Sequence, residues 1–293
     1  MDIERTQARL ENAETVEPML GALRTISLGT WQSAVNRRQG LKTTSREYDA
    51  MLASLMPALM KIREAKKRPA AQEARCDRQV VVLAGTERGL CGRLDQDLID
   101  FAKQSPELVR SMESSEFVVI GGRLSKAVAR QLAAPEKTYS ASSTALPAFP
   151  EVFGMIQGWL QRLANHELGR VLVFFTAFHG ATQREPSVIQ LLPYELDLGA
   201  SGHSESWPPP IIETDPAQLF VRIYEQLAAI RLYDVLLQTK AAIHSARFQM
   251  MEDSTKNAER LIEELTIILQ TERRQAITRE MQELAVGAGL LQH

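Results

Sequence analysis

Apolar side chains recur at every third or fourth position over residues 3–68 and again over residues 217–286. This spacing predicts a long amphipathic helix at each end of the chain. Pro18 and Pro57 lie within the first helix, and an internal proline removes a backbone hydrogen bond, so we expect that helix to bend or to break once. It should end near the basic cluster KIREAKKRP, because cations are favoured at a helix C-terminus.

The C-terminal helix has a feature that the N-terminal one lacks, since residues 217–286 contain neither glycine nor proline. At 1.5 Å per residue such a helix would extend for roughly 105 Å, so we expect it to leave the body of the protein and to need a partner for its apolar stripe. A 4-3 spacing within it is typical of a coiled-coil seam. The seam positions are Leu237, Ala241, His244, Phe248, Met251, Thr255, Ala258, Ile262, Leu265 and Leu269. The expected partner is the N-terminal helix, paired antiparallel.

The seam spacing fails after Leu269, where the next positions would be Glu272, Ala276 and Arg279. The helix then ends in the apolar stretch LAVGAGLL. An apolar helix end that lies far from its own core indicates an external binding partner.

Residues 77–213 alternate between short β-branched runs and helical patterns, which predicts a sheet covered by helices on at least one face. We expect strands within 78–85, 115–122, 169–178 and 186–196, and helices within 95–104, 123–134 and 151–165. Two polar, proline-containing stretches, 136–150 and 199–216, are expected to be loops. The predicted fold class is α/β plus a long antiparallel coiled coil, with a Rossmann-like domain (77–213) inserted between N-terminal (1–70) and C-terminal (214–293) helices.

Composition narrows the functional classes. The 34 Lys and Arg residues nearly balance the 36 Asp and Glu residues, for a net charge of −2, which excludes a strongly basic nucleic-acid binder. An apolar content of 44% excludes a disordered chain. Two cysteines cannot form a disulfide framework. The N-terminus is polar and the longest apolar run, 171–178, is too short to cross a bilayer, so we expect a soluble protein.

No catalytic constellation is evident. The segment TERGLCG (86–92) follows a predicted strand, where phosphate-binding loops occur, but its glycines match neither common nucleotide-binding pattern. A tight turn is therefore favoured over a nucleotide site, although a nucleotide-dependent enzyme is kept as a weak alternative. The five histidines lack metal-ligand spacing, and no base accompanies Cys91. We expect no metal and no cofactor.

Two stretches carry a family resemblance. TERGLCGRLDQDL (86–98) resembles the Ser/Thr-Asp-Arg-Gly-Leu-Cys-Gly-Gly-Leu-Asn signature of the gamma subunit of F-type ATP synthases. The C-terminal stretch is similar to the same family's closing pattern. The matching residues there are Arg247, Met251, Thr255, Asn257, Ala258, Arg273, Ile277, Thr278, Glu280, Glu283, Gly287 and Ala288.

The resemblance implies a non-catalytic rotor. The two terminal helices would form a central-stalk shaft inside a ring of alpha and beta subunits, and the sheet domain would stand against the epsilon subunit and the membrane c-ring. Such a subunit couples ion translocation through the c-ring to ATP synthesis or hydrolysis at the beta subunits. Its expected location is peripheral, at the cytoplasmic face of the inner (plasma) membrane.

The resemblance also assigns residues to partners. Arg273 and Thr278, with Arg274 beside them, match positions that contact a catch loop of beta. The shaft tip would be Leu284, Val286, Leu290 and Leu291, and the side facing epsilon and the c-ring would contain Arg88, Gly89, Leu90, Cys91 and Gly92.

Departures from the family pattern leave an alternative open. The family's first helix is basic, whereas AETVEPML here is acidic and carries Pro18; Arg274 replaces a usual Gln, and Ile243 replaces a usual Glu. We therefore expect a divergent or alternate-operon gamma subunit. The alternative is a helical scaffold or adaptor that has lost the rotary role.

Overall fold

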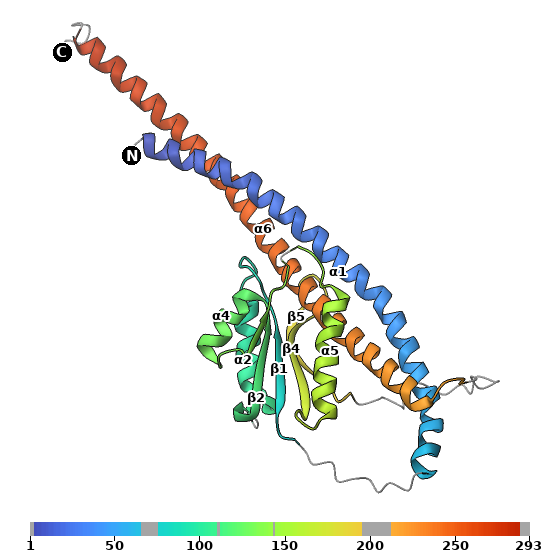
Figure 1. Ribbon diagram of the computed structural model, residues 1–293. Coiled ribbons are helices and arrows are strands. Elements are labelled where there is room, and N and C mark those ends of the chain that lie inside the picture. The colour runs from blue at the N-terminus through green and yellow to red at the C-terminus, as the bar shows by residue number, and fades with distance from the viewer. Residues whose placement is uncertain (1–2, 66–75, 110–111, 143, 195–211, 288–293) are drawn as a thin grey trace. The chain divides into compact units, whose positions relative to one another are not determined.

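The computed structural model describes residues 3–65, 76–109, 112–142, 144–194 and 212–287 (Figure 1). The chain divides into two compact units. The first, here called the helix-pair unit, contains residues 1–28 and 247–293, and the second, the sheet unit, contains residues 29–246. The units group the residues differently from the three sequence segments, because helices α1 (Ile3–Ala65) and α6 (Pro216–Gly287) each contribute to both.

The sheet unit is built on five strands in the order β3-β2-β1-β4-β5. Strands β3, β2, β1 and β4 run parallel, and β5 pairs antiparallel with β4. Their bounds are Gln79–Ala84 for β1, Ser115–Ile120 for β2, Lys137–Tyr139 for β3, Arg170–Phe178 for β4 and Arg184–Leu192 for β5. The parallel part has the strand order of one half of a dinucleotide-binding sheet, so the Rossmann-like architecture predicted for this region is confirmed.

Helices cover both faces of this sheet (Figure 1). The connecting elements are α2 (Leu94–Gln104), α3 (Pro106–Val109), a 3-10 turn (Met112–Ser114), α4 (Gly122–Gln131) and α5 (Phe149–Ala164). Alternate residues of β1 serve the two faces: Val81 and Leu83 pack with α2 and α4, whereas Val80 and Val82 pack with α5 and α6. A strand buried on both faces must be apolar at every position, which explains the run QVVVLA.

Strand β3 was not expected, because it lies in the polar stretch predicted as a loop. It pairs three residues with Val118–Ile120 at the edge of the sheet. Its residues are exposed or half-buried, so its pairing depends on backbone hydrogen bonds and leaves no apolar signal in the sequence. The second predicted loop, 199–216, lies almost wholly outside the described residues.

Helix α1 is continuous from Ile3 to Ala65, so the predicted alternative of a break at Pro18 or Pro57 is wrong. A proline costs the helix a hydrogen bond, but tertiary packing compensates for this loss near Pro57. There, Leu52 and Leu55 are buried against Ile223 and Leu227 of α6. Burying such side chains stabilises the paired helices by about 1.5–3 kcal/mol each.

The two long helices pair antiparallel within each unit. In the helix-pair unit, Arg24 forms an ion pair with Glu252 at 2.7 Å, and Arg273 donates to Gln7 at 3.5 Å. In the sheet unit, Arg38 and Asp234 form an ion pair at 2.9 Å. Rising numbers in α1 thus meet falling numbers in α6, which confirms the antiparallel pairing.

The predicted seam lies on the inner face of α6. In the helix-pair unit the seam residues Met251, Thr255, Leu265 and Leu269 are buried, and Phe248, Ala258 and Ile262 are half-buried. The seam residues of the sheet unit, Leu237, Ala241 and His244, are buried as well. Leu237 and Ala241 differ from the expectation in one respect, since they join the core beneath the sheet and do not serve the helix pair alone.

Candidate partner-binding surfaces

The loop that follows β1 has two faces. Leu90 and Gly92 adopt left-handed backbone angles, with φ of 66° and 67°, and this conformation is rare for leucine. The resulting turn leaves Leu90 53% exposed and buries Cys91 against Ile243 and Ala246 of α6. Strained backbone conformations of this kind cluster at functional sites.

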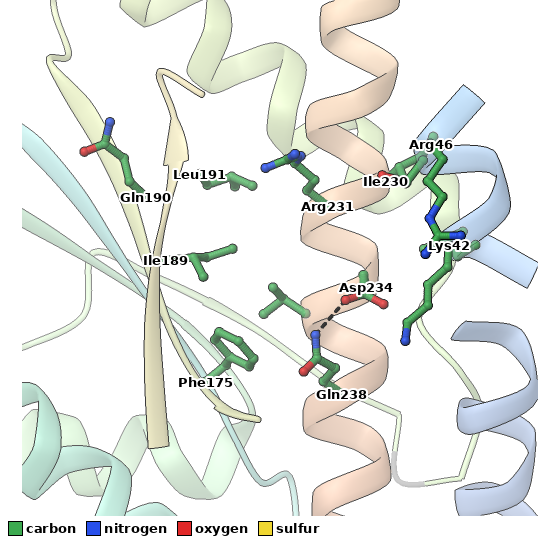
Figure 2. A pocket seen from close by; sticks show the side chains of 13 residues that line it. Lys42, Arg46, Phe175, Ile189, Gln190, Leu191, Ile230, Arg231, Asp234 and Gln238 are labelled. Carbon is green, nitrogen blue, oxygen red and sulfur yellow. Dashed lines mark hydrogen bonds between the residues drawn. The ribbon is translucent and has the colours of Figure 1, made fainter. Parts of the chain in front are cut away.

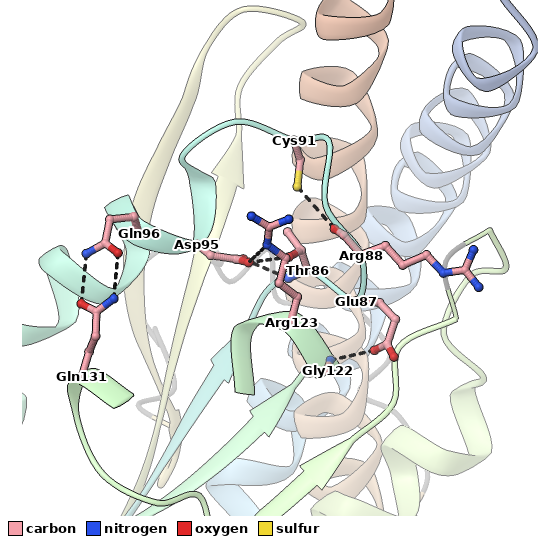
Figure 3. Close-up of polar contacts among 9 residues, drawn as sticks. All are labelled: Thr86, Glu87, Arg88, Cys91, Asp95, Gln96, Gly122, Arg123 and Gln131. Carbon is pink, nitrogen blue, oxygen red and sulfur yellow. Dashed lines mark hydrogen bonds and ion pairs between the residues drawn. The ribbon is translucent and has the colours of Figure 1, made fainter. Parts of the chain in front are cut away.

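Glu87, in the same loop, accepts three hydrogen bonds. The donors are the backbone N–H of Gly122 at 2.8 Å, the backbone N–H of Ala141 at 3.0 Å and the Ser140 hydroxyl at 3.2 Å. Burial acts to raise the pKa of Glu87, but these bonds, together with the charge of Lys240, hold the pKa below its usual value. The carboxylate therefore anchors the loop to the start of α4 (Figure 3) and, through Ser140 and Ala141, to the segment after β3.

Asp95 ties the other end of the loop to its beginning. Its carboxylate accepts the Thr86 backbone N–H at 3.1 Å and also the Thr86 hydroxyl, and Arg123 lies 3.9 Å away. Burial raises the pKa of Asp95, and the bonds from Thr86 oppose this change. A phosphate bound at the start of α2 or α4 would meet the carboxylates of Asp95 and Glu87. The geometry thus disfavours the nucleotide-site reading of this loop.

The anchoring role of Glu87 predicts a pH-dependent stability difference. A carboxylate with a lowered pKa stabilises the fold above its unfolded-state pKa, and that contribution is lost as the pH falls through the folded-state pKa. The Glu87→Gln variant should unfold about 1–3 kcal/mol more easily at pH 7. Urea denaturation between pH 3 and pH 7 measures this difference in unfolding free energy between the variant and the unmodified chain. The difference should narrow as the pH falls below about 4.5. A gap that stays constant over this range would contradict the anchoring role.

The residues at the C-terminal part of α6 are exposed, although Arg273 also donates to Gln7 of α1. Arg273, Arg274 and Thr278 are exposed, and the Thr278 hydroxyl donates to the Arg274 carbonyl at 2.8 Å. Leu284 is 68% exposed and Val286 is 62% exposed. Leu290 and Leu291, which were assigned to the same tip, lie outside the described residues.

Two features of these surfaces were missed by the sequence reasoning. One is Glu87, although its place directly after a strand and before the Arg-Gly pair was an available signal. The other is the exposure of Val16, Leu23 and Ile26 on α1, which the apolar periodicity had counted among the packed positions, and of Met19 beside them. Small or polar residues such as Thr6, Ala13 and Ser27 occupy the buried positions of that helix, so hydrophobicity alone pointed to the wrong face.

Among the described residues, no cluster of His, Cys, Asp and Glu side chains has the arrangement of a metal site. Within the same residues, every helix is too short or too polar to span a lipid bilayer.

Comparisons with known proteins agree over nearly the whole chain. Residues 2–291 match the family model described as ATP synthase. An ATP synthase gamma chain from Akkermansia muciniphila is 28% identical over 268 residues, which cover 86% of this chain and 88% of that one. A gamma chain from Glaesserella parasuis is 25% identical and covers 88% of this chain and 90% of its own.

Solved structures share the fold. A chain of the Euglena gracilis mitochondrial ATP synthase, from a structure of its OSCP, F1 and c-ring, superposes with a TM-score of 0.61 at 14% identity. That match covers 99% of this chain and 96% of the other. A central-stalk chain of the Tetrahymena thermophila enzyme gives a TM-score of 0.56 and covers 80% of this chain and 99% of its own. The chain therefore belongs to the ATP synthase gamma family, the non-catalytic central-stalk subunits of a membrane-bound ATP synthase.

Proposed function

We propose that this chain is a rotor that couples ion translocation through a membrane c-ring to ATP synthesis or hydrolysis at beta subunits. Its partners would be the alpha and beta subunits, the epsilon subunit and the c-ring, at the cytoplasmic face of the inner (plasma) membrane. Each beta subunit would be biased toward the conformation that best fits the shaft face it meets, which is a population shift driven by differential binding.

One observation carries the proposal: the helix-pair unit exposes apolar side chains although its seam is already closed. On α1 they are Val16, Met19, Leu23 and Ile26, and on α6 they are Ile277, Met281, Leu284 and Val286. Exposed apolar surface of this extent indicates a partner that encloses it. A ring of subunits around the helix pair would satisfy that requirement.

The contacts with beta would be made by Arg273, Arg274 and Thr278. Arg273 and Arg274 extend from an exposed part of α6, and guanidinium groups form strong charge-assisted hydrogen bonds with carboxylates. The tip residues Leu284, Val286, Leu290 and Leu291 would bear against the apolar inside of the ring.

The side of the chain that faces epsilon and the c-ring would contain Arg88, Gly89, Leu90, Cys91 and Gly92. Support comes from the outward position of Leu90 and the exposure of Arg88. Buried Cys91 would act indirectly, by fixing the loop against α6.

A helical scaffold without a rotary role is the second candidate. It is favoured by the acidic stretch AETVEPML on α1, in which Glu14 and Pro18 are exposed. Acidic residues on a shaft would repel acidic side chains on the surrounding subunits. In a rotor, this stretch would therefore need alpha and beta subunits whose facing charges differ accordingly.

Reconstitution tests the two candidates. The full chain is mixed with alpha and beta subunits from the same source, and the complex is isolated and assayed for ATP hydrolysis. A rotor should give alpha, beta and this chain in a 3:3:1 ratio. The Arg273→Ala/Thr278→Ala variant should then hydrolyse ATP about 30-fold more slowly, because it lacks two contacts with beta of about 1 kcal/mol each.

Arg279→Gln is the matched control, since Arg279 is exposed on the same part of α6 and was not assigned to beta. It should keep ATP hydrolysis within about twofold of the unmodified complex. Failure of the chain to assemble with alpha and beta subunits would reject the rotor and leave the scaffold.

A further inference from the structure

A half-open cavity of about 380 Å³ lies in the sheet unit, lined by α1, the strands β4 and β5, and α6. Its size is at the lower end of the range for small-molecule sites. Its walls combine two kinds of side chain (Figure 2). Phe175, Ile189 and Leu191 line it from the sheet, and Lys42 and Arg46 line it from α1.

The two cations of α1 are available to a ligand. Lys42 and Arg46 are one helical turn apart and both are exposed. Among the described residues, neither makes a hydrogen bond or an ion pair. Two like charges at this spacing repel each other slightly. An anion bound between them would relieve this repulsion and would also contact both cations.

The acidic residue in the lining, Asp234, is already neutralised. Arg38 forms an ion pair with it at 2.9 Å, and the Gln238 amide donates to its other oxygen at 2.6 Å. Asp234 therefore does not cancel the positive charge of Lys42 and Arg46, and the cavity keeps an excess of cations.

Arg231, in the same lining, has one donor without an acceptor in the part of the chain that the structure describes. It lines the cavity, and its guanidinium lies over the Tyr194 ring and reaches toward Asp49 at 3.7 Å. Its Nε–H, however, is buried and finds no acceptor among the described residues. A buried donor without an acceptor is unusual, and a bound ligand or water is a common reason for one.

We propose that this cavity binds a small amphipathic carboxylate. The apolar body of the ligand packs against Phe175, Ile189 and Leu191, and its carboxylate accepts hydrogen bonds from Lys42 and Arg46. Such a ligand touches α1, the sheet and α6 together, so it binds the folded sheet unit and raises its stability by mass action. The site is independent of the proposed rotor function, because it involves none of the residues assigned to partners.

Calorimetric titration of the full chain with sodium decanoate tests the site. We expect one decanoate per chain, with a Kd of about 0.1–1 mM for a ligand of this size. 1-Decanol has the apolar chain without the charge, and inorganic phosphate has the charge without the chain. Each should bind at least about tenfold more weakly than decanoate.

Two matched double variants test whether the ligand binds at Lys42 and Arg46. Lys42→Gln/Arg46→Gln should weaken decanoate binding about tenfold, because two charge-assisted contacts are lost. Lys126→Gln/Arg130→Gln removes two exposed cations with the same spacing on α4 and should change the Kd less than about twofold. The proposal is overturned if decanoate does not bind, if both double variants weaken it equally, or if phosphate alone binds as tightly.

Discussion

Replacement of Leu265 with glutamine should open the helix-pair unit. Leu265 is a seam residue that is only 3% exposed. The change removes about 2 kcal/mol of stabilisation from apolar burial and places an amide in the seam without a hydrogen-bond partner. Together these effects should lower the free energy of unfolding by about 3–5 kcal/mol. Glutamine and leucine have similar helix propensities, so the loss would be due to packing between α1 and α6.

Ile267→Gln is the control for this prediction, because Ile267 lies two residues away on the same helix and is 59% exposed. Its effect should stay within about 0.5 kcal/mol. Hydrogen exchange measured on peptides from residues 3–28 and 250–269 separates the two variants. Exchange should approach that of an unfolded chain in Leu265→Gln only, and equal protection in both would show that the seam does not hold these helices together.

Gly121→Ala should destabilise the sheet unit by about 3 kcal/mol or more, because two independent costs add. Gly121 has φ of 125°, a conformation that side chains rarely adopt. A Cβ there would also lie 2.7 Å from the Thr86 carbonyl oxygen and 2.8 Å from that of Gly85. Both oxygens belong to backbone that cannot move without shifting the loop which carries Glu87 and Leu90.

The matched substitution Gly40→Ala should stabilise the fold, in contrast to Gly121→Ala. Gly40 is exposed on α1, and an added Cβ would have no atom within 4 Å. Alanine favours helix over glycine by about 0.5–1 kcal/mol. Urea unfolding of both variants measures the contrast, and a neutral Gly121→Ala would mean that the junction between β2 and α4 rearranges at little cost.

Much of the fold followed from local patterns. The absence of glycine and proline over 217–286 predicted one uninterrupted helix, and α6 is that helix. The apolar runs around Val81, Val119 and Val173 predicted three of the strands that form the sheet. Such signals are reliable because periodicity and propensity act within a few residues of the chain. The family resemblance was also readable from two stretches of sequence.

Long-range contacts decided the rest. Whether α1 breaks at Pro57 depends on the burial of Leu52 and Leu55 by α6, and the edge strand β3 depends on a free edge of β2. The role of Glu87 exists only where Gly122 and Ala141 come to meet it. The spacing of residues along the chain therefore determined which elements form, whereas packing between distant segments determined which faces are buried, which charges are neutralised and where a cavity remains, because those interactions join residues that the sequence keeps far apart.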